Sequence, residues 1–182
     1  MTATYEKIAT TTLGSASATV TFSSISGSYT DLVLVINGGI TDAGFVFGIR
    51  LNSDTGSNYS STAMYGNSSS AFSDRKSNFT LGQITTDMQG GHIFNTHIIN
   101  FQNYSNTTTN KTWVGRSSAN YSATGSGATT VPHVGSVVGL WRNTSAITSI
   151  SISESGLGGS GSFAYGNTLS GSTFTLYGIK AE

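Results

Sequence analysis

Three histidines and thirty serines are the residues with which this chain could build a nucleophilic triad. Such a triad needs a base beside a serine and a third group that orients the base. His92 and His97 fall within an apolar stretch, and His133 follows the only proline, Pro132. No Gly-x-Ser-x-Gly elbow occurs. The pattern therefore predicts histidines of the core or of loops, and no catalytic triad.

Carboxylates are the second set of residues that could do chemistry, since glycoside hydrolysis needs two of them across one cleft. The eight acidic residues are spread singly along the chain: Glu6, Asp31, Asp42, Asp54, Asp74, Asp87, Glu154 and Glu182. Asp31, ahead of an apolar segment, and Asp54, within Asn-Ser-Asp-Thr-Gly, are predicted to form Asx turns. No spacing suggests a carboxylate pair, and the chain is predicted not to be an enzyme.

The chain lacks the residues that usually build metal and cofactor sites. The segment Asn52–Gly56 resembles half of a calcium-binding loop, but the later bidentate glutamate is missing, so a plain turn is favoured. Without cysteine there is no disulfide framework and no thiolate zinc site. No glycine-rich segment matches a phosphate-binding loop that leads into a helix. The sequence predicts no catalytic residue, no metal ligand and no cofactor.

Trp113 and Trp141 leave two interpretations open. An indole face with asparagine and serine nearby can stack on a sugar ring, whereas an indole inside a strand is usually part of the core. Each tryptophan lies inside an alternating, strand-like pattern, so the core interpretation is favoured. Carbohydrate recognition by exposed tyrosine and tryptophan stays as the alternative.

The elements that must position these residues are predicted to be strands. Of 182 residues, 80 are serine, threonine or glycine and only 16 are charged. Threonine, valine, isoleucine and aromatic residues favour pleated sheets, and glycine, serine and asparagine favour turns. Eight basic and eight acidic residues cancel, so the chain lacks the clustered positive charge with which proteins bind nucleic acid. The longest apolar run, Leu32–Ile36, is far shorter than the roughly 20 residues that cross a bilayer, so no membrane partner is expected.

Alternation with period two predicts ten or eleven strands and little or no helix. They are expected at Tyr5–Thr10, Ala18–Phe22, Asp31–Asn37, Phe45–Leu51, Tyr59–Tyr65, Phe79–Ile84, His92–Gln102, Lys111–Arg116, Val134–Trp141, Ile147–Ser153 and Ser172–Lys180. The longest stretches without a strand pattern, expected as surface loops, are Gly66–Ser77, Ala119–Pro132 and Glu154–Ser170.

These segments predict one all-β domain over residues 1–182, a two-sheet antiparallel sandwich resembling a jelly roll. Residues 1–12 are expected as an extended arm or an edge strand.

Several segments carry more than composition. They are Ser57–Ser60, Asn100–Thr109, Val138–Ile150 and Gly171–Ala181, together with Tyr29–Val35. In these segments the chain resembles small all-β virion structural proteins of tailed phages, especially phages of cyanobacteria, some of which are capsid cement or decoration proteins.

The resemblance implies a protein made in the host cytoplasm that binds the outer surface of the mature capsid and stabilises it. The implied partners are the major capsid protein and further copies of the chain, as a homotrimer. The alternative is a tail-fibre or receptor-binding head domain that recognises host surface glycan.

Overall fold

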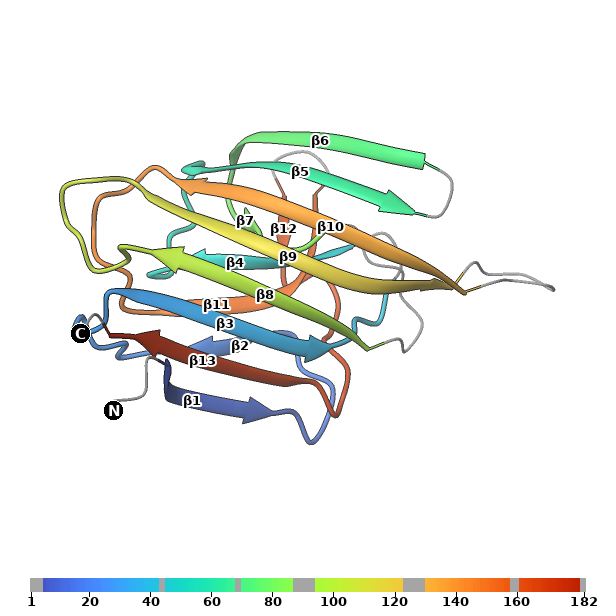
Figure 1. The fold of residues 1–182 in the computed structure, drawn as a ribbon, viewed down its shortest axis with the longest axis horizontal. Helices are drawn as coiled ribbons and strands as arrows, with labels where there is room; N and C mark the ends of the chain where they lie inside the picture. The colour runs from blue at the N-terminus through green and yellow to red at the C-terminus, as the bar shows by residue number, and fades with distance from the viewer. Residues whose placement is uncertain are drawn as a thin grey trace.

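The computed structural model is built of strands, and it describes residues 5–42, 45–67, 70–86, 94–122, 130–157 and 161–180. Within these residues there are thirteen strands and no helix, arranged in two antiparallel sheets (Figure 1). None of these segments forms a helix with the length and apolarity needed to cross a membrane. The prediction of an all-β, two-sheet antiparallel sandwich is confirmed.

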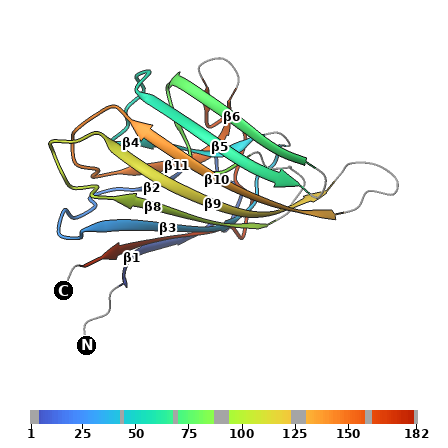
Figure 2. The same cartoon turned by 45° about the horizontal axis from the view of Figure 1, so that its top comes forward.

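The larger sheet has eight strands and the smaller has five. The larger contains β1 (Tyr5–Thr12), β13 (Thr173–Ile179), β3 (Asp31–Gly38), β8 (Asn95–Gln102), β9 (Lys111–Ser122), β10 (Thr130–Trp141), β5 (Tyr59–Asn67) and β6 (Ser70–Phe79), in that order. The smaller contains β12 (Ser162–Phe163), β11 (Ile150–Gly156), β4 (Val46–Leu51) and β7 (Gly82–Gln83), and β2 (Val20–Phe22) pairs with β11. In Figure 2 the eight strands form one curved layer, with β4, β11 and β2 behind it.

Consecutive strands often cross between the two sheets: β1 and β2, β3 and β4, β7 and β8, and β12 and β13 each lie in opposite sheets. The hairpins β5–β6 and β9–β10 instead widen the larger sheet. The finer description as a jelly roll stays a prediction.

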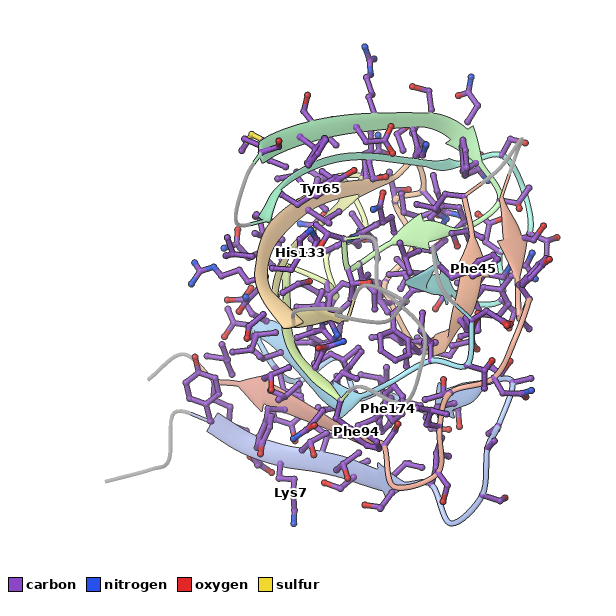
Figure 3. The ribbon with its side chains drawn as sticks, turned by 90° about the vertical axis from the view of Figure 1, so that its right-hand side faces the viewer. Lys7, Phe45, Tyr65, Phe94, His133 and Phe174 are labelled. Atoms are coloured by element: carbon purple, nitrogen blue, oxygen red, sulfur yellow. The ribbon has the colours of Figure 1, made fainter. Side chains whose placement is uncertain are left out.

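The core fills the space between the sheets, because alternate residues of the long strands point inward. Leu34 and Ile36 of β3 and Phe47 and Ile49 of β4 are fully buried, as is Phe174 of β13. Phe47 and Phe174 meet edge to face, with ring centroids 5.9 Å apart. Figure 3 looks at one end of the sandwich, with side chains filling the space between the layers.

One predicted loop is wrong, because most of Gly66–Ser77 belongs to β6. This strand lies at the edge of the larger sheet, and most of its side chains are exposed on both faces. Such a strand needs no buried apolar face, so the alternation that identifies a strand is missing. The expected strand Phe79–Ile84 is likewise wrong, since Phe79 ends β6 and β7 is only Gly82–Gln83.

Other boundaries differ by several residues. The expected loop at 119–132 is shortened, because β9 continues to Ser122 and β10 begins at Thr130. The strand expected at Ile147–Ser153 is β11, and β11 together with β12 occupies part of the expected loop Glu154–Ser170. Residues 5–12 form the edge strand β1, whereas Met1 to Thr4, Asp87, His92 and Glu182 lie outside the described residues.

Candidate functional site

The two described histidines lie inside the sandwich. His97 in β8 is fully buried, and its ring meets Phe47 edge to face at 5.6 Å. Neither of its nitrogens has a hydrogen-bond partner among the residues that the structure describes. Burial lowers the pKa of His97 to about 3. His133 in β10 is also buried, with its ring 5.2 Å from Tyr65, and burial lowers its pKa as well. No hydrogen bond joins either imidazole to a serine in the described part of the chain, which agrees with core histidines.

Trp113 and Trp141 are also core residues, each with 1% of its surface exposed, as the favoured interpretation predicts. Each indole satisfies its single donor internally. The Trp113 Nε1–H donates to the carbonyl of Gln83 at 2.8 Å, and the Trp141 Nε1–H donates to a carboxylate oxygen of Asp54 at 2.6 Å. Neither tryptophan is therefore available to stack on a sugar.

Asp54 accepts three hydrogen bonds from its surroundings. The Gly56 amide donates at 2.7 Å, which is the expected Asx turn, and Asn58 Nδ2 and Trp141 Nε1 donate to the other oxygen. Three donors point at this carboxylate, which is the environment of a structural turn and is unsuited to a calcium ion. Asp31 departs from the expected Asx turn, since its carboxylate accepts from the distant Asn103 amide at 2.7 Å.

Replacing Asp54 with asparagine should destabilise the fold by about 2 kcal/mol at pH 7, because an amide group would place N–H donors against N–H donors. Burial raises the pKa of Asp54, but hydrogen bonds from Trp141, Asn58 and Gly56 outweigh it, so the pKa is lowered. The ionised carboxylate of Asp54 therefore stabilises the fold at pH values above the ordinary range of aspartate pKa values. This stabilisation is lost as the pH falls through and below that range. Urea unfolding at pH 7 and pH 3 measures both effects.

The matched control is Asp74→Asn, which breaks only the partly exposed ion pair between Asp74 and Lys76. Its expected change at pH 7 is within about 0.5 kcal/mol. Equal losses in the two variants would show that the hydrogen bonds of Asp54 add nothing to stability.

Asp42 and Glu154, which are far apart in sequence, lie together beside the paired strands β4 and β11. A Cβ built on Gly166 would lie 2.6 Å from Asp42 Oδ2 and 2.7 Å from Glu154 Oε1. Since both oxygens lie within 2.7 Å of one point, they are no more than about 5.4 Å apart. No spacing in the sequence suggests this pair, and only the fold reveals it.

The two carboxylates have different environments. Glu154 is fully buried and accepts from the Thr41 amide and hydroxyl, both at 3.0 Å, and from the Asp42 amide at 3.2 Å. Burial raises the pKa of Glu154, aided by the charge of Asp42 and opposed by these hydrogen bonds. Asp42 is exposed, and among the described residues only the Thr41 hydroxyl approaches its carboxylate, at 3.4 Å. Glu154 therefore anchors the loop, while Asp42 can accept hydrogen bonds from a ligand.

Two aromatic rings lie beside this pair. Tyr165 immediately precedes Gly166 and stacks on Phe45, with ring centroids 4.4 Å apart and planes inclined by 21°. Phe45 is half-buried and packs against the core, whereas Tyr165 is 61% exposed. We call Asp42, Phe45, Glu154, Tyr165 and Gly166 the Tyr165 corner. Its exposed ring and free carboxylate make it a candidate binding site.

A second candidate surface lies on the outer face of the larger sheet. Met64, Ser136, Arg116 and Ile98 form one row across β5, β10, β9 and β8. Exposed apolar side chains gather along and beside this row: Met64 (64% exposed), Val134 (69%), Val138 (53%) and Ile98 (42%). We call these four residues the outer patch.

A hollow of about 680 Å³ adjoins the outer patch, lined by residues that include Met64, Phe72, Arg116 and Val134. Single exposed apolar residues are ordinary on protein surfaces, but a contiguous group of them marks an interaction surface. Sequence reasoning did not find this patch, because the register that aligns the four strands is not visible in any one segment.

Comparisons with protein families, with curated proteins and with solved structures found no match. Within the described residues, no group of three or more histidine or acidic side chains is placed to hold a metal ion. The two surfaces that the geometry offers for interaction are the outer patch and the Tyr165 corner.

Proposed function

We propose that this chain is a structural protein of a tailed-phage virion, a decoration protein that binds the outer surface of the mature capsid and stabilises it. The observation that carries the proposal is the outer patch, an exposed apolar surface on the eight-stranded sheet. The sequence resemblance supports the phage origin. A two-layer β-sandwich is also an architecture that viral capsid proteins use, which supports the proposal by analogy of fold.

Copies of the chain are the proposed occupant of the outer patch, in trimers. The patch contains no acidic residue, and Arg116 is the only charged member of its central row. Because the whole chain has a net charge of zero, copies do not repel one another over long range. Burying Met64, Val134 and Val138 against another copy would remove their apolar surface from water, which favours association.

Decoration stabilises a shell by linkage. A protein that binds the expanded lattice more tightly than the unexpanded shell shifts the equilibrium toward the expanded lattice. The size of the shift is set by the difference between its affinities for these two states. In this proposal the outer patch holds the oligomer together, and the remaining surfaces contact the major capsid protein. Repetition of the contact over the shell multiplies the effect.

The test of capsid binding is co-sedimentation of the purified chain with expanded, undecorated shells of its phage, together with the melting temperature of those shells. We expect saturable binding at a fixed ratio to the capsomers and a raised melting temperature. Absence of binding, with an unchanged melting temperature, would overturn the capsid proposal.

The test of self-association is light scattering coupled to gel filtration, in which a trimer has three times the 18.9 kDa mass of the chain. Val138→Lys should shift the population to monomer, because it would bury an unpaired charge in the contact. The control Thr19→Lys adds the same charge at an exposed residue that precedes β2 in the smaller sheet. A monomeric wild type, or equal effects of the two variants, would contradict the role of the outer patch.

A further inference from the structure

We infer that the Tyr165 corner is a carbohydrate site that binds a neutral pyranose through the exposed ring of Tyr165 and the free carboxylate of Asp42. This activity goes beyond capsid decoration and does not depend on it. The corner combines the two features with which proteins hold sugars, an aromatic face for the C–H groups of the ring and an oxygen acceptor for its hydroxyls.

The ring of Tyr165 is held in place before any ligand arrives. One of its faces stacks on Phe45, and Phe45 packs against the core. Gly156 leaves room for Phe45, since a Cβ there would lie 3.0 Å from the Phe45 ring. A ring fixed on one side and 61% exposed presents its other face to solvent at little entropic cost, which favours binding.

The backbone of Asp42 is held by the buried Glu154. The Asp42 amide donates to Glu154 Oε1, and both the amide and the hydroxyl of Thr41 donate to Glu154 Oε2. Gly166 allows the carboxylates to approach the backbone next to Tyr165, a space that any side chain would fill. Asp42 is thereby placed next to Gly166, the residue that follows Tyr165, and its exposed carboxylate can accept hydrogen bonds.

Further polar groups adjoin these two. Two hydrogen bonds join Thr41 and Asn167. The Thr41 amide donates to the Asn167 carbonyl at 3.0 Å, and the Asn167 amide donates to the side-chain oxygen Oγ1 of Thr41 at 3.2 Å. This arrangement leaves the side-chain amide of Asn167 exposed beside Gly166, with both donors and an acceptor. Pairs of neighbouring sugar hydroxyls can therefore meet a carboxylate and an amide together.

The charges of the corner restrict the ligand. Asp42 and Glu154 are both acidic, so an acidic sugar would be repelled. Glu154 has both oxygens engaged by protein donors, so it is unavailable for hydrolysis and for metal ligation. The corner is therefore suited to binding a neutral sugar directly, without cleaving it and without an intervening cation.

The test is saturation-transfer NMR of the full chain with methyl glucoside, methyl galactoside, methyl mannoside and glucuronic acid, with and without EDTA. We expect transfer to the C–H groups of at least one neutral glycoside, no transfer to glucuronic acid, and no change on adding EDTA. No transfer to any neutral glycoside, or loss of transfer with EDTA, would overturn the inference.

Variants locate the site. Tyr165→Ala should weaken binding of the responsive glycoside by about tenfold or more, Asp42→Asn should weaken it severalfold, and Tyr165→Phe should retain it. Tyr5→Ala is the matched control, because Tyr5 is a tyrosine of similar exposure, 57%, on the edge strand β1. Equal binding by Tyr165→Ala and the wild type, or equal loss in Tyr5→Ala, would contradict the assignment. Unchanged melting temperatures of the variants exclude unfolding as the cause.

Discussion

Gly139→Ala is expected to destabilise the fold by about 3 kcal/mol or more, because the new methyl group would overlap the indole of Trp113. A Cβ built on Gly139 would lie 1.9 Å from Cε2 and 2.0 Å from Cζ2 of that ring. On its other side the indole occupies the space that a side chain at position 82 would need, since its Cη2 lies 2.6 Å from the Cβ position of Gly82. Its Nε1 is also held by the Gln83 carbonyl.

The matched control for this substitution is Gly66→Ala in the neighbouring strand β5. The nearest atom to a Cβ at Gly66 is 3.6 Å away, which is an ordinary contact. The expected change is within about 1 kcal/mol and in the stabilising direction, since alanine restricts the unfolded chain. Urea unfolding followed by tryptophan fluorescence measures both variants. Similar stabilities for the two would show that the indole has room to move and that the close packing of Trp113 is not required.

Acid should unfold this chain through His97. The pKa of the buried imidazole is about 3, against 6.5 for an unperturbed histidine, so between these values the unfolded chain binds a proton that the folded chain does not. Unfolding is therefore favoured as the pH falls below about 6.5, by about 1.4 kcal/mol per pH unit once the unfolded histidine is protonated. We expect a loss of about 2 kcal/mol between pH 6.5 and pH 4.5.

His97→Met should remove most of this dependence and should also raise stability at neutral pH, because it replaces two unpartnered buried nitrogens with an apolar side chain of similar size. His97→Gln keeps a polar group that does not titrate, and it separates the effect of ionisation from that of polarity. Urea unfolding at pH 7.5, 6.5, 5.5 and 4.5 is the measurement. Parallel curves for the wild type and both variants would mean that another group causes the acid sensitivity.

His133 acts in the same direction as His97, because burial lowers its pKa as well, whereas Asp54 and Glu154 act in different ways. The lowered pKa of Asp54 makes its contribution disappear only at more acidic pH, at and below the ordinary aspartate range. The raised pKa of Glu154 acts in the opposite direction, since a folded carboxyl that binds its proton more tightly stabilises the fold as the pH falls. A decline that starts near pH 6.5 therefore identifies histidine.

Much of the fold follows from local patterns. The run Leu32–Ile36 is apolar on both faces, and it belongs to β3 near the middle of the larger sheet. The alternation of Phe47, Ile49 and Leu51 with smaller or polar residues identifies β4 and its inward face. These strands are predictable because burial imposes a period of two on their sequences. The core positions of Trp113 and Trp141 follow from the same rule.

The interaction surfaces were not predictable in this way. Asp42 and Glu154 meet only in the fold, where β11 pairs with β4 and the Asp42 amide donates to Glu154 Oε1. Met64 and Val134 become neighbours only in the register of β5 with β10. Such contacts depend on how distant segments pair, and pairing leaves no trace in the composition of either segment. The edge strand β6 was not predicted from the sequence for the opposite reason. Most of its side chains are exposed, so burial imposes no alternation of apolar and polar residues on its sequence.

The position of β13 has a consequence for the order of events during synthesis. This strand, Thr173–Ile179, follows all other described strands in the chain, yet it lies between β1 and β3 and pairs with both. While the ribosome has not yet made these seven residues, β1 has no neighbour and one side of β3 is open. The larger sheet can therefore close only after translation has passed residue 179, and such distant pairing makes folding slow, on the order of milliseconds to seconds. Nascent chains in a crowded cell would expose two unpaired strands during that interval, a period in which domain swapping between neighbouring chains competes with folding.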